Sequence, residues 1–413
     1  MKTKSRLLKS QNQVLNQLDA LHVAWDNYAN NSFQQLMAQV CASISFNLDQ
    51  HIVAAALPLF ESEKVAAIEW SFDTLYKVAD IPTWFVELLQ TFSKEKRLIG
   101  HGIYFSLFSG AWTKEQQNWL EHLSKVSRAF HFDHITEHFG FMTGENFHQG
   151  APISIPFTTS TLSIGQDRLK RIYNACYCPV GIENLAFSYS IDEVKRHGDF
   201  LSKLVAPVNG FIILDLHNLY CQSKNFDIPV DEMLELYPLD LVREIHISGG
   251  SWEDSVVKPG FRIRRDTHDE AVPAEVFELL RMIMPRCSRL KYVVLEQLSM
   301  GLETQNKQER FRLDFEQMDD IIQQWNNINH FMDYNSFLPL QIEIAEQPPE
   351  DLLLKEQQKK LSGILETATS TEQALKLLRS SNLSGTEWSV EKWEPHMVET
   401  AIAIAQKWKN GFN

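Results

Sequence analysis

The stretch GFIILDLHNLY, residues 210–220, indicates most clearly how this chain folds. Its first half is a short apolar run with two adjacent isoleucines, typical of a strand that is buried on both faces. Asp215 follows directly, and His217 and Asn218 come after it. An acidic residue in that place is commonly the N-cap of a helix, and it can also be a functional group at a strand end. The stretch therefore predicts a buried strand that leads into a helix through a polar corner.

Similar apolar runs recur along the chain and alternate with helical stretches. The helical stretches include FVELLQTF, EQQNWLEHLSKVSRAF, IDEVKRHGDFLSKLV and PAEVFELLRMIM. The strand-like runs are HIVAAALPL (51–59), VAAIEWS (65–71), RLIGHGIYFSL (97–107), HITEHF (134–139), PVGIENL (179–185), GFIILDL (210–216), VREIHIS (242–248) and KYVVLEQ (291–297). Strands that alternate with helices form parallel βα units, and eight such units close a barrel. We therefore predict an α/β fold, a (β/α)8 TIM barrel.

Both ends of the chain have a different pattern. Residues 5–28 carry apolar side chains at three- and four-residue spacings, which predicts an amphipathic helix that packs on the main domain or binds a partner. After residue 330 the apolar residues again follow helical spacing, Ser370–Gln373 resembles a capping box, and QPPEDL (347–352) is typical of a linker. The predicted domains are an N-terminal helical extension (1–48), a TIM barrel (49–330) and a C-terminal helical appendage (331–413).

The composition argues against several classes of protein. With 39 basic and 53 acidic residues, the 413-residue chain has a net charge of −14, which disfavours binding to nucleic acid. Its five scattered cysteines are too few for a disulfide framework and indicate reduced thiols. The basic start MKTKSRLLKSQNQ lacks the apolar stretch of a signal peptide, and no run is long enough to span a membrane. We therefore expect a soluble cytoplasmic protein without a membrane or nucleic-acid partner.

Polar residues gather where the predicted strands end. Barrel enzymes place their chemistry at the carboxyl ends of the strands, so these side chains are expected to meet on one face. From the third strand onward they are His101, Glu137, His138, Glu183, Asn184, Asp215, His217, Asn218, His246 and Glu296. Each alone has an ordinary structural explanation, but clustered carboxylates repel one another unless cations neutralise them. Together they predict a metal site with two or three ions, because one ion cannot use so many ligands. Imidazole and carboxylate donors suit iron, manganese or zinc.

The segment RRDTHD, residues 264–269, adds polar residues after the seventh strand. On an extended backbone alternate residues point the same way, so Asp266 and His268 are able to hold one object between them. The two arginines in front of them, Arg264 and Arg265, fit either a contact to a peptide carboxylate or a solvated basic pair. A polar surface loop is the alternative interpretation, and the matching residues at the other strand ends favour a metal site.

These residues occur in blocks that resemble a known family. In chain order the blocks are HG (101–102), EHFGF (137–141), ENLAF (183–187), LDLHNLY (214–220), EIHISG (244–249), DTHD (266–269) and LEQ (295–297). They resemble the multinuclear non-heme iron-dependent oxidative enzymes, the family of methanobactin biosynthesis oxidase, over roughly residues 50–305. The resemblance implies a xylose-isomerase-like barrel with two or three iron ions, mixed Fe(II)/Fe(III), and O₂ as co-substrate. It also implies oxidative modification of a ribosomally synthesised peptide, at or near a cysteine or C-terminal residue, usually with a partner protein that delivers this precursor.

Carried over residue by residue, the resemblance implies three metal positions. The sets are His101, His138 and Glu183; the bridging Glu183 with Asp215, His246 and Glu296; and Asn218, Asp266 and His268. Candidates for contacts to the substrate are Arg264, Arg265 and Asn184. No catalytic residue is assigned beyond the metal ligands.

Two departures from the family pattern bear on this interpretation. Asn184 is followed by Leu185 where the family usually has proline, which affects the expected shape of that loop. The family's helper is usually a separate chain, whereas this chain carries its own helical tail. The tail is expected to replace part of the helper, to recognise a leader peptide, or only to pack on the barrel.

Three alternatives to the iron enzyme stay open at this point. A trinuclear zinc phosphodiesterase similar to endonuclease IV would use nearly the same ligands, but it has a histidine where this chain has Asn218. A sugar isomerase with two divalent ions would use fewer ligands. A non-enzymatic scaffold would bind no metal.

Overall fold

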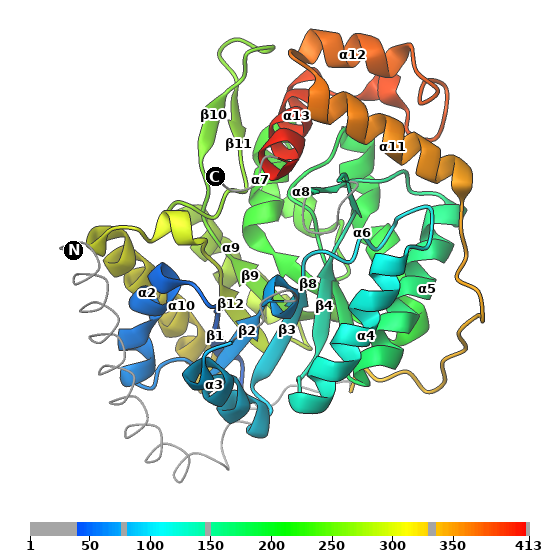
Figure 1. Cartoon of the computed structure of the whole chain (residues 1–413). Helices are drawn as coiled ribbons and strands as arrows, with labels where there is room; N and C mark the ends of the chain where they lie inside the picture. Colours follow the sequence, from blue (N-terminus) through cyan, green and yellow to red (C-terminus); the bar gives the residue numbers. More distant parts are fainter. Residues whose placement is uncertain (1–38, 76–80, 145–149, 329–335, 410–413) are drawn as a thin grey trace, which may run out of the picture.

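The computed structural model describes residues 39–75, 81–144, 150–328 and 336–409. Within these residues the centre is a closed barrel of eight parallel strands, in the order β1, β12, β9, β8, β7, β4, β3 and β2 (Figure 1). The strands are β1 (Cys41–Ser45), β2 (Ala67–Trp70), β3 (Leu98–Gly102), β4 (Ile135–His138), β7 (Val180–Glu183), β8 (Phe211–Asp215), β9 (Val242–Ile247) and β12 (Tyr292–Leu295). The predicted (β/α)8 barrel is therefore confirmed.

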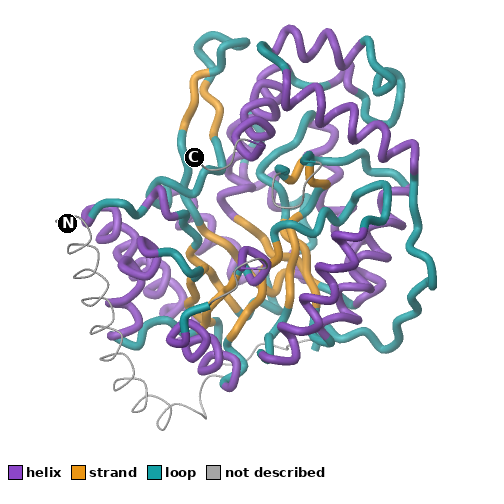
Figure 2. Tube along the Cα trace, viewed as in Figure 1, coloured by secondary structure: helices purple, strands orange, loops and turns teal. Residues whose placement is uncertain are grey.

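Helices surround the barrel, because each parallel strand needs a crossover before the next one (Figure 2). The helices are α2 (Gln50–Glu61), α3 (Thr83–Lys94), α4 (Lys114–Ala129), α5 (Thr159–Cys176), α6 (Ile191–Val205), α7 (Leu216–Phe226), α8 (Val230–Leu234), α9 (Ala274–Ile283) and α10 (Gln305–Ile328). Short 3-10 turns are η2 (Phe72–Leu75), η3 (Ala206–Val208), η4 (Leu239–Leu241), η5 (Met284–Arg286), η6 (Ser299–Gly301) and η7 (Val390–Lys392). The long α10 packs against α2 and β1, so the last helix around the barrel lies beside the first.

Seven of the eight predicted strands are strands in the structure, and the first prediction is wrong. The run HIVAAALPL belongs to α2, where the side chain of Asp49 accepts from the backbone N–H of His51 (2.8 Å) and Ile52 (3.2 Å) as an N-cap. Its alanines favour a helix, and its buried residues follow helical spacing. The first barrel strand is CASIS, β1, which lies before the predicted start of the barrel at residue 49. Two serines interrupt the apolar pattern there, so the run does not stand out as a strand.

The carboxyl-terminal part of the described chain forms a helical appendage, as predicted. It consists of α11 (Leu352–Thr367), α12 (Thr371–Arg379) and α13 (Pro395–Lys409), and Ser370 caps α12 by accepting from the backbone N–H of Gln373 at 3.2 Å. The predicted helix over 5–28 lies outside the described residues. The division into three domains remains a prediction, as does the cytoplasmic location. Across the described residues every helix is too short or too polar to cross a membrane.

Two small hairpins extend the loops at the carboxyl ends of the strands. One pairs β5 (Phe141–Met142) with β6 (Pro152–Ile153), and the other pairs β10 (Trp252–Asp254) with β11 (Arg262–Arg264). The β10–β11 hairpin rises beside α13 in Figure 1. It leads directly into the RRDTHD segment, so it positions the residues that follow the seventh barrel strand.

Charged side chains fill part of the barrel interior, where branched apolar residues are the usual filling. His246 of β9 contacts Glu69 of β2, and Glu244 of β9 contacts His134 at the start of β4. Neither pair comes from neighbouring strands, so both contacts cross the inside of the barrel. All four side chains are fully buried. The interior is therefore built to hold charge next to the strand ends.

The placement of β1 predicts how two substitutions affect stability. Ile44 in β1 is fully buried, and Ile44→Ala is expected to lower the free energy of unfolding by about 2–5 kcal/mol because it leaves a cavity. Leu353 on α11 is 62% exposed, and Leu353→Ala is expected to change it by less than about 0.5 kcal/mol. Urea unfolding followed by circular dichroism measures both values. Equal, small losses would contradict the assignment of CASIS to the barrel.

Candidate metal centre

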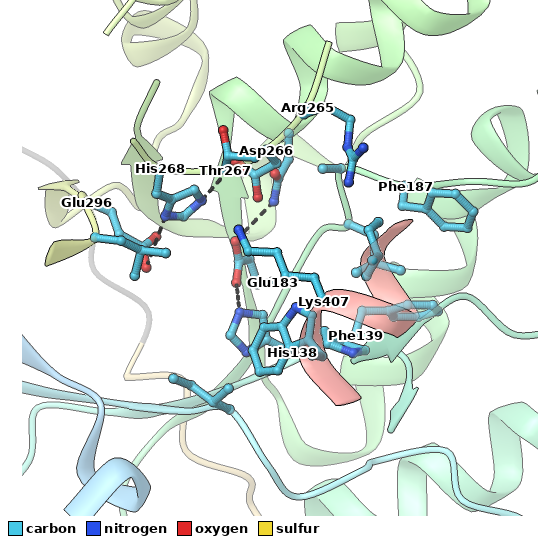
Figure 3. A pocket seen from close by; sticks show the side chains of 18 of the residues that line it. His138, Phe139, Glu183, Phe187, Arg265, Asp266, Thr267, His268, Glu296 and Lys407 are labelled. Carbon is cyan, nitrogen blue, oxygen red and sulfur yellow. Dashed lines mark hydrogen bonds and ion pairs between the residues drawn. The ribbon is translucent and has the colours of Figure 1, made fainter. Parts of the chain in front are cut away.

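The ends of six barrel strands, with two adjacent segments, bring all the predicted metal-binding residues to one place. In three sets, a ligand atom from each member lies within 4.8 Å of the others. The sets are His101, His138 and Glu183; Glu183, Asp215 and His246; and Asp215, His268 and Glu296. Asn218 and Asp266 adjoin them, because Asn218 donates to Glu183 (3.1 Å) and Asp266 lies 2.8 Å from His268. Figure 3 shows His138, Glu183, Asp266, His268 and Glu296 around one pocket. Metal binding by these residues remains a prediction.

His101 and His138 face each other with their Nε2 atoms 3.4 Å apart. Thr136 donates to a backbone carbonyl, so its oxygen accepts from Nδ1 of His101 at 2.8 Å. Nδ1 of His138 donates to the carbonyl of Gly102 at 3.2 Å. Both rings therefore carry their proton on Nδ1 and a lone pair on Nε2. Oε2 of Glu183 lies 3.5 Å and 3.2 Å from the two Nε2 atoms. With Glu183 ionised these three atoms share no proton, and a cation between them satisfies all three.

His246 is held from inside the barrel. Its Nε2 lies 3.0 Å from Oε2 of Glu69 and 3.5 Å from Oε1 of Glu244, so the ring donates from Nε2. Nδ1 faces the cluster, 3.3 Å from Oε2 of Glu296 and 4.0 Å from Oε1 of Glu183. A carboxylate that accepts from the far nitrogen of a metal-binding histidine orients the ring and raises its basicity. Glu69 and Glu244 therefore position His246 with Nδ1 toward the candidate metal centre.

The RRDTHD segment places Asp266 between two histidines. Oδ1 of Asp266 lies 2.8 Å from Nε2 of His268 and 2.9 Å from Nδ1 of His217. Nε of Arg264 donates to Nε2 of His217 at 3.1 Å, which keeps the proton of that ring on Nδ1, facing Asp266. His268 has a left-handed backbone, with φ of 51°, a conformation that is strained for a residue other than glycine and is often found at functional sites. Its Nδ1 lies 3.6 Å from Oε1 of Glu296. Arg264 and His217 therefore position Asp266 beside His268.

Several buried atoms of the cluster have no hydrogen-bond partner within the described residues. They are Oε2 of Glu183, Oδ2 of Asp215, Oδ1 of Asn218 and Nδ1 of His246. A buried acceptor without a partner costs about 1–3 kcal/mol, so such atoms are rare in native structures. All four are oxygen or nitrogen donors of the kind that bind iron, manganese or zinc. These atoms therefore fit a group of metal ions.

The pKa shifts show where negative charge lacks compensation. Burial, and next the charge of Asp215, raise the pKa of Glu183 well above its usual value, although His246 opposes the shift. Burial and the neighbouring Asp266 raise the pKa of Asp215 to about 7. Burial lowers the pKa of His101 well below its usual value and that of His138 to about 4. The two histidines are therefore neutral, as metal ligands must be, and the positive charge near the two carboxyl groups does not offset their burial.

Protons compensate the remaining members of the cluster. Burial opposes the charged form of His246, but Glu69 raises the pKa of its ring well above the usual value. Likewise Asp266 raises the pKa of His268 in spite of burial. Burial also opposes the charged forms of Asp266 and Glu296, but the neighbouring His268 holds the pKa values of both carboxyl groups below the usual value. Since an imidazole binds metal in its neutral form, metal binding would release these protons.

Part of this arrangement does not follow from the sequence pattern. Glu69 is the only acidic residue in the run VAAIEWS, the second predicted strand. The polar residues predicted to form the site begin with the third strand, so Glu69 is not among them. Glu244 lies two residues before His246 on one strand, a spacing that places both on the same face. His217 is among the predicted polar residues, but its contacts with Arg264 and Asp266 join segments far apart in the chain. Glu137 belongs to none of the sets, and its Oε1 accepts from a backbone N–H at 3.4 Å.

The three predicted substrate contacts have structural partners. Arg264 and Arg265 are 5% and 8% exposed, so the interpretation as a solvated basic pair is wrong. Arg265 forms an ion pair with Glu253. The side chain of Asn184 accepts from the backbone N–H of Asp215 at 2.7 Å and donates to its carbonyl at 3.2 Å. All three still line the cavity described next, so contact with a substrate remains a prediction.

A cavity of about 340 Å³ lies over the candidate metal centre. Metal-ligand candidates form part of its surface, and apolar side chains such as Phe139, Leu185 and Phe187 form another part. In Figure 3 the end of α13 crosses the same pocket, and Lys407 is drawn among the pocket residues beside His138 and Glu183. The cavity therefore joins an apolar wall to a group of candidate metal ligands.

Fold and site together define a class of protein. It is a (β/α)8 barrel with a cluster of imidazole and carboxylate groups, suited to more than one metal ion, at the carboxyl ends of its strands. The chain belongs to a family of enzymes that modify ribosomally synthesised peptides, because the family model "RiPP precursor modification enzyme MbnB/TglH/ChrH" matches residues 77–300, more than half of the chain. The family resemblance identified from the sequence is thereby confirmed.

The chain is also similar to UPF0276 proteins. A UPF0276 protein of Chromobacterium violaceum is 27% identical over 163 residues, which cover 38% of this chain and 56% of that protein. One from Acaryochloris marina is 25% identical over 189 residues, 45% of this chain and 64% of that protein. The chain thus matches less than two thirds of each of these relatives.

Similar solved structures have low sequence identity. D-psicose 3-epimerase from Clostridium cellulolyticum H10 superposes with a TM-score of 0.46 at 9% identity, over 69% of this chain and 99% of that chain. The IolI protein with a binding zinc atom gives a TM-score of 0.45 at 10% identity, over 68% and 95% of the two chains.

The orientation of His246 predicts the effect of changing Glu69. Glu69→Ala is expected to weaken metal binding by about 10–100-fold, because His246 loses the acceptor that fixes its ring. Glu69→Gln keeps an accepting oxygen and is expected to retain most of the affinity, and Glu61→Gln on the exposed end of α2 serves as the unchanged control. Competition with a chelator of known affinity measures all four proteins. Wild-type affinity in Glu69→Ala would contradict the role given to Glu69.

Proposed function

We propose that the chain is an oxidoreductase that binds two or three iron ions and uses O₂ to modify a ribosomally synthesised peptide at or near a cysteine or C-terminal residue. Membership of the family supports a peptide substrate. The observation that carries the proposal of a metal centre is the group of buried ligand atoms of His101, His138, Glu183 and Asp215, in which Oε2 of Glu183 and Oδ2 of Asp215 have no hydrogen-bond partner within the described residues. The separation of these atoms suits several ions that share bridging carboxylates.

The proposed ligand sets differ in one respect from those that the resemblance implies, because Glu296 is assigned to the third ion, where its carboxylate groups with Asp215 and His268. His101, His138 and Glu183 would hold the first ion, and Glu183 with Asp215 and His246 would hold the second. The third would lie near His268 and Asp266, where Asp215 and Glu296 are also within reach. The remaining predicted ligand, Asn218, uses its NH₂ group to donate to Glu183 and Asn184, which leaves its Oδ1 as the donor atom for an ion.

Mixed Fe(II)/Fe(III) ions in this site would supply electrons for the reduction of O₂ and a Lewis-acidic position for a substrate thiolate. The chain's own residues would orient the ligands and limit access of water. Glu69 holds His246 from the barrel interior, and Arg264 holds Asp266 through His217. The apolar wall around Phe139 and Phe187 would exclude water from the reacting groups. We further propose that a partner protein delivers the precursor peptide to the cavity.

Metal content tests the proposed centre. Protein purified without oxygen is expected to contain two or three iron ions per chain by mass spectrometry, and His246→Ala or Glu183→Ala is expected to reduce this number to near one. His131→Ala, a change at an exposed histidine, is the matched control and should leave the content unchanged. Zinc alone after growth with added iron would contradict the oxidative proposal and favour hydrolysis by a zinc phosphodiesterase or catalysis by a metal-dependent sugar isomerase. A chain without metal would contradict the centre itself.

Peptide modification tests the proposed reaction. A search of the reading frames beside the gene for a short cysteine-containing peptide supplies the candidate precursor. The mass of that peptide is expected to change only with iron-loaded protein and O₂ together. Mass spectrometry of the peptide after incubation with and without O₂ measures this dependence. The same change in the absence of O₂, or with the metal removed, would show that the reaction is not the proposed one.

A further inference from the structure

The apolar residues that line the cavity over the candidate metal centre differ in how far they are packed into the protein. Several are buried and form part of the core: Phe139, Leu185, Phe187 and Met397. Three aliphatic side chains of the lining are only partly buried. Leu298 is 37% exposed, and Ile103 and Ile404 are half-buried. These three side chains therefore leave apolar surface accessible beside the candidate metal ligands.

Two of the three aliphatic residues belong to barrel loops that also carry candidate metal ligands. Ile103 follows β3 and comes two residues after His101, and its backbone N–H donates to Oδ2 of Asp73 at 2.9 Å. Leu298 follows β12, and its backbone N–H donates to the carbonyl of His268 at 2.9 Å. Since these backbone contacts fix both loops, the two side chains have defined positions next to the candidate metal centre.

The third aliphatic residue, Ile404, belongs to α13 of the appendage, which is fixed on both sides of it. Towards the start of the helix, Nε2 of His396 donates to the backbone carbonyl of Asn225 at 3.0 Å. Towards its end, Gln406 donates to the backbone carbonyl of Ala368 at 2.8 Å. The helix lies outside residues 77–300, the part of the chain that matches the family model. The tail of this chain therefore adds its own apolar side chain to the cavity.

The position of these side chains is typical of a binding site for an apolar group. Single half-exposed aliphatic residues are common on protein surfaces, but here three of them, from separate elements, line one cavity. Small-molecule sites combine such apolar surface with a few polar groups that fix the orientation of the ligand. The cavity, at about 340 Å³, is near the lower end of the usual range of about 300–1,000 Å³. A peptide residue at the metal centre therefore has only its neighbours in the peptide beside it in the cavity.

We propose that Ile103, Leu298 and Ile404 form an apolar subsite that binds an aliphatic side chain of the substrate peptide, on the residue next to the one that is modified. Burial of the two apolar surfaces against each other removes both from water, which favours such a peptide over one with glycine in that place. This inference rests on the proposed function, because it adds a preference for a class of substrate to the same site. The aliphatic residue either precedes or follows the modified residue in the peptide.

Binding of short thiol peptides to the iron-loaded full chain tests the inference. The probes are two uncharged pairs of equal length: N-acetyl-Gly-Cys-amide with N-acetyl-Val-Cys-amide, and N-acetyl-Cys-Gly-amide with N-acetyl-Cys-Val-amide. Isothermal titration calorimetry without oxygen is expected to give a dissociation constant about ten-fold lower for the valine probe than for the glycine probe in at least one pair. The pair that shows this difference identifies on which side of the cysteine the aliphatic residue lies.

Leu298 offers a matched pair of variants, because another exposed apolar residue follows it closely. Leu298→Ser is expected to bring the ratio of the two dissociation constants close to one and to leave the binding of the glycine probe unchanged. Met300, two residues further on, is 44% exposed and is not part of the cavity lining. Met300→Ser is therefore expected to keep the full ratio.

The appendage offers a second, independent pair of variants. Ile404→Ser is expected to lower the ratio in the same way, whereas Leu377→Ser, at an exposed position of α12 outside the cavity lining, is expected to keep it. All four side chains are at least partly exposed, so thermal unfolding should show the same folded state for each variant. A lower ratio in Leu298→Ser or Ile404→Ser, without a change in its control, supports the subsite. Unchanged ratios in both, or equal changes in the controls, would overturn it.

The outcomes also separate this inference from the proposed function. If all four probes bind the wild-type protein with the same affinity, thiol binding at the metal centre stands and the apolar subsite is overturned. If none of the probes binds the iron-loaded protein, the proposed binding of a thiol at the metal centre is overturned together with the subsite.

Discussion

Carboxylates that are gathered in a buried place must be compensated by positive charge, and the structure of this protein depends on how that compensation is arranged. Inside the barrel the compensation comes from the chain itself. His134 lies 2.7 Å from Glu244, and Asp133, which adjoins His134, pairs with Arg243 at 2.7 Å. At the carboxyl ends of the strands the chain provides imidazoles in place of arginine or lysine pairs for Glu183 and Asp215. Removing one partner of a buried charged pair is strongly destabilising, whereas an ion that is bound from solvent supplies the missing charge without a change of fold. Inside the barrel, as far as His246, protein groups thus neutralise the buried charges. At the carboxyl ends of the strands, in our account, metal cations neutralise the remaining carboxylates.

The residues around the cluster are of two kinds: candidate metal ligands, and residues whose hydrogen bonds orient the side chains of those ligands. Glu69 and Glu244 fix the ring of His246, and Arg264 fixes His217, which in turn directs Asp266. Such partners determine which nitrogen of a histidine carries the lone pair, so they matter to metal binding as much as the ligands do. The appendage also contributes to the surroundings of the cluster. Its last helix is fixed at both ends, and one face of that helix lines the cavity over the cluster.

The sequence reveals the parts of this arrangement that follow a regular pattern. Apolar runs that end in histidine or a carboxylate, such as those before Asp215 and His246, identify both the barrel strands and most of the cluster. The first strand lacks such a pattern because serines interrupt CASIS, while the apolar run at 51–59 is a helix with an aspartate cap. Pairings across the barrel, such as that of Glu69 with His246, depend on strand positions around the ring, which local spacing does not specify. The position of α13 over the cavity depends in the same way on tertiary contacts between residues far apart in the chain, so the pattern predicts the helix and not what it covers.

The central claim is that the clustered side chains bind several ions at once, and anomalous diffraction at the iron absorption edge tests it most directly. Crystals grown without oxygen from iron-loaded protein are expected to give two or three strong peaks. One should lie about 2.0–2.2 Å from Nε2 of both His101 and His138, and a second at a similar distance from Nδ1 of His246. A third peak, where present, should lie beside His268. The protein must also be shown to bind iron in solution, and the crystals must diffract well. Under these conditions, a single peak, or peaks that lie away from these nitrogens, would contradict the account.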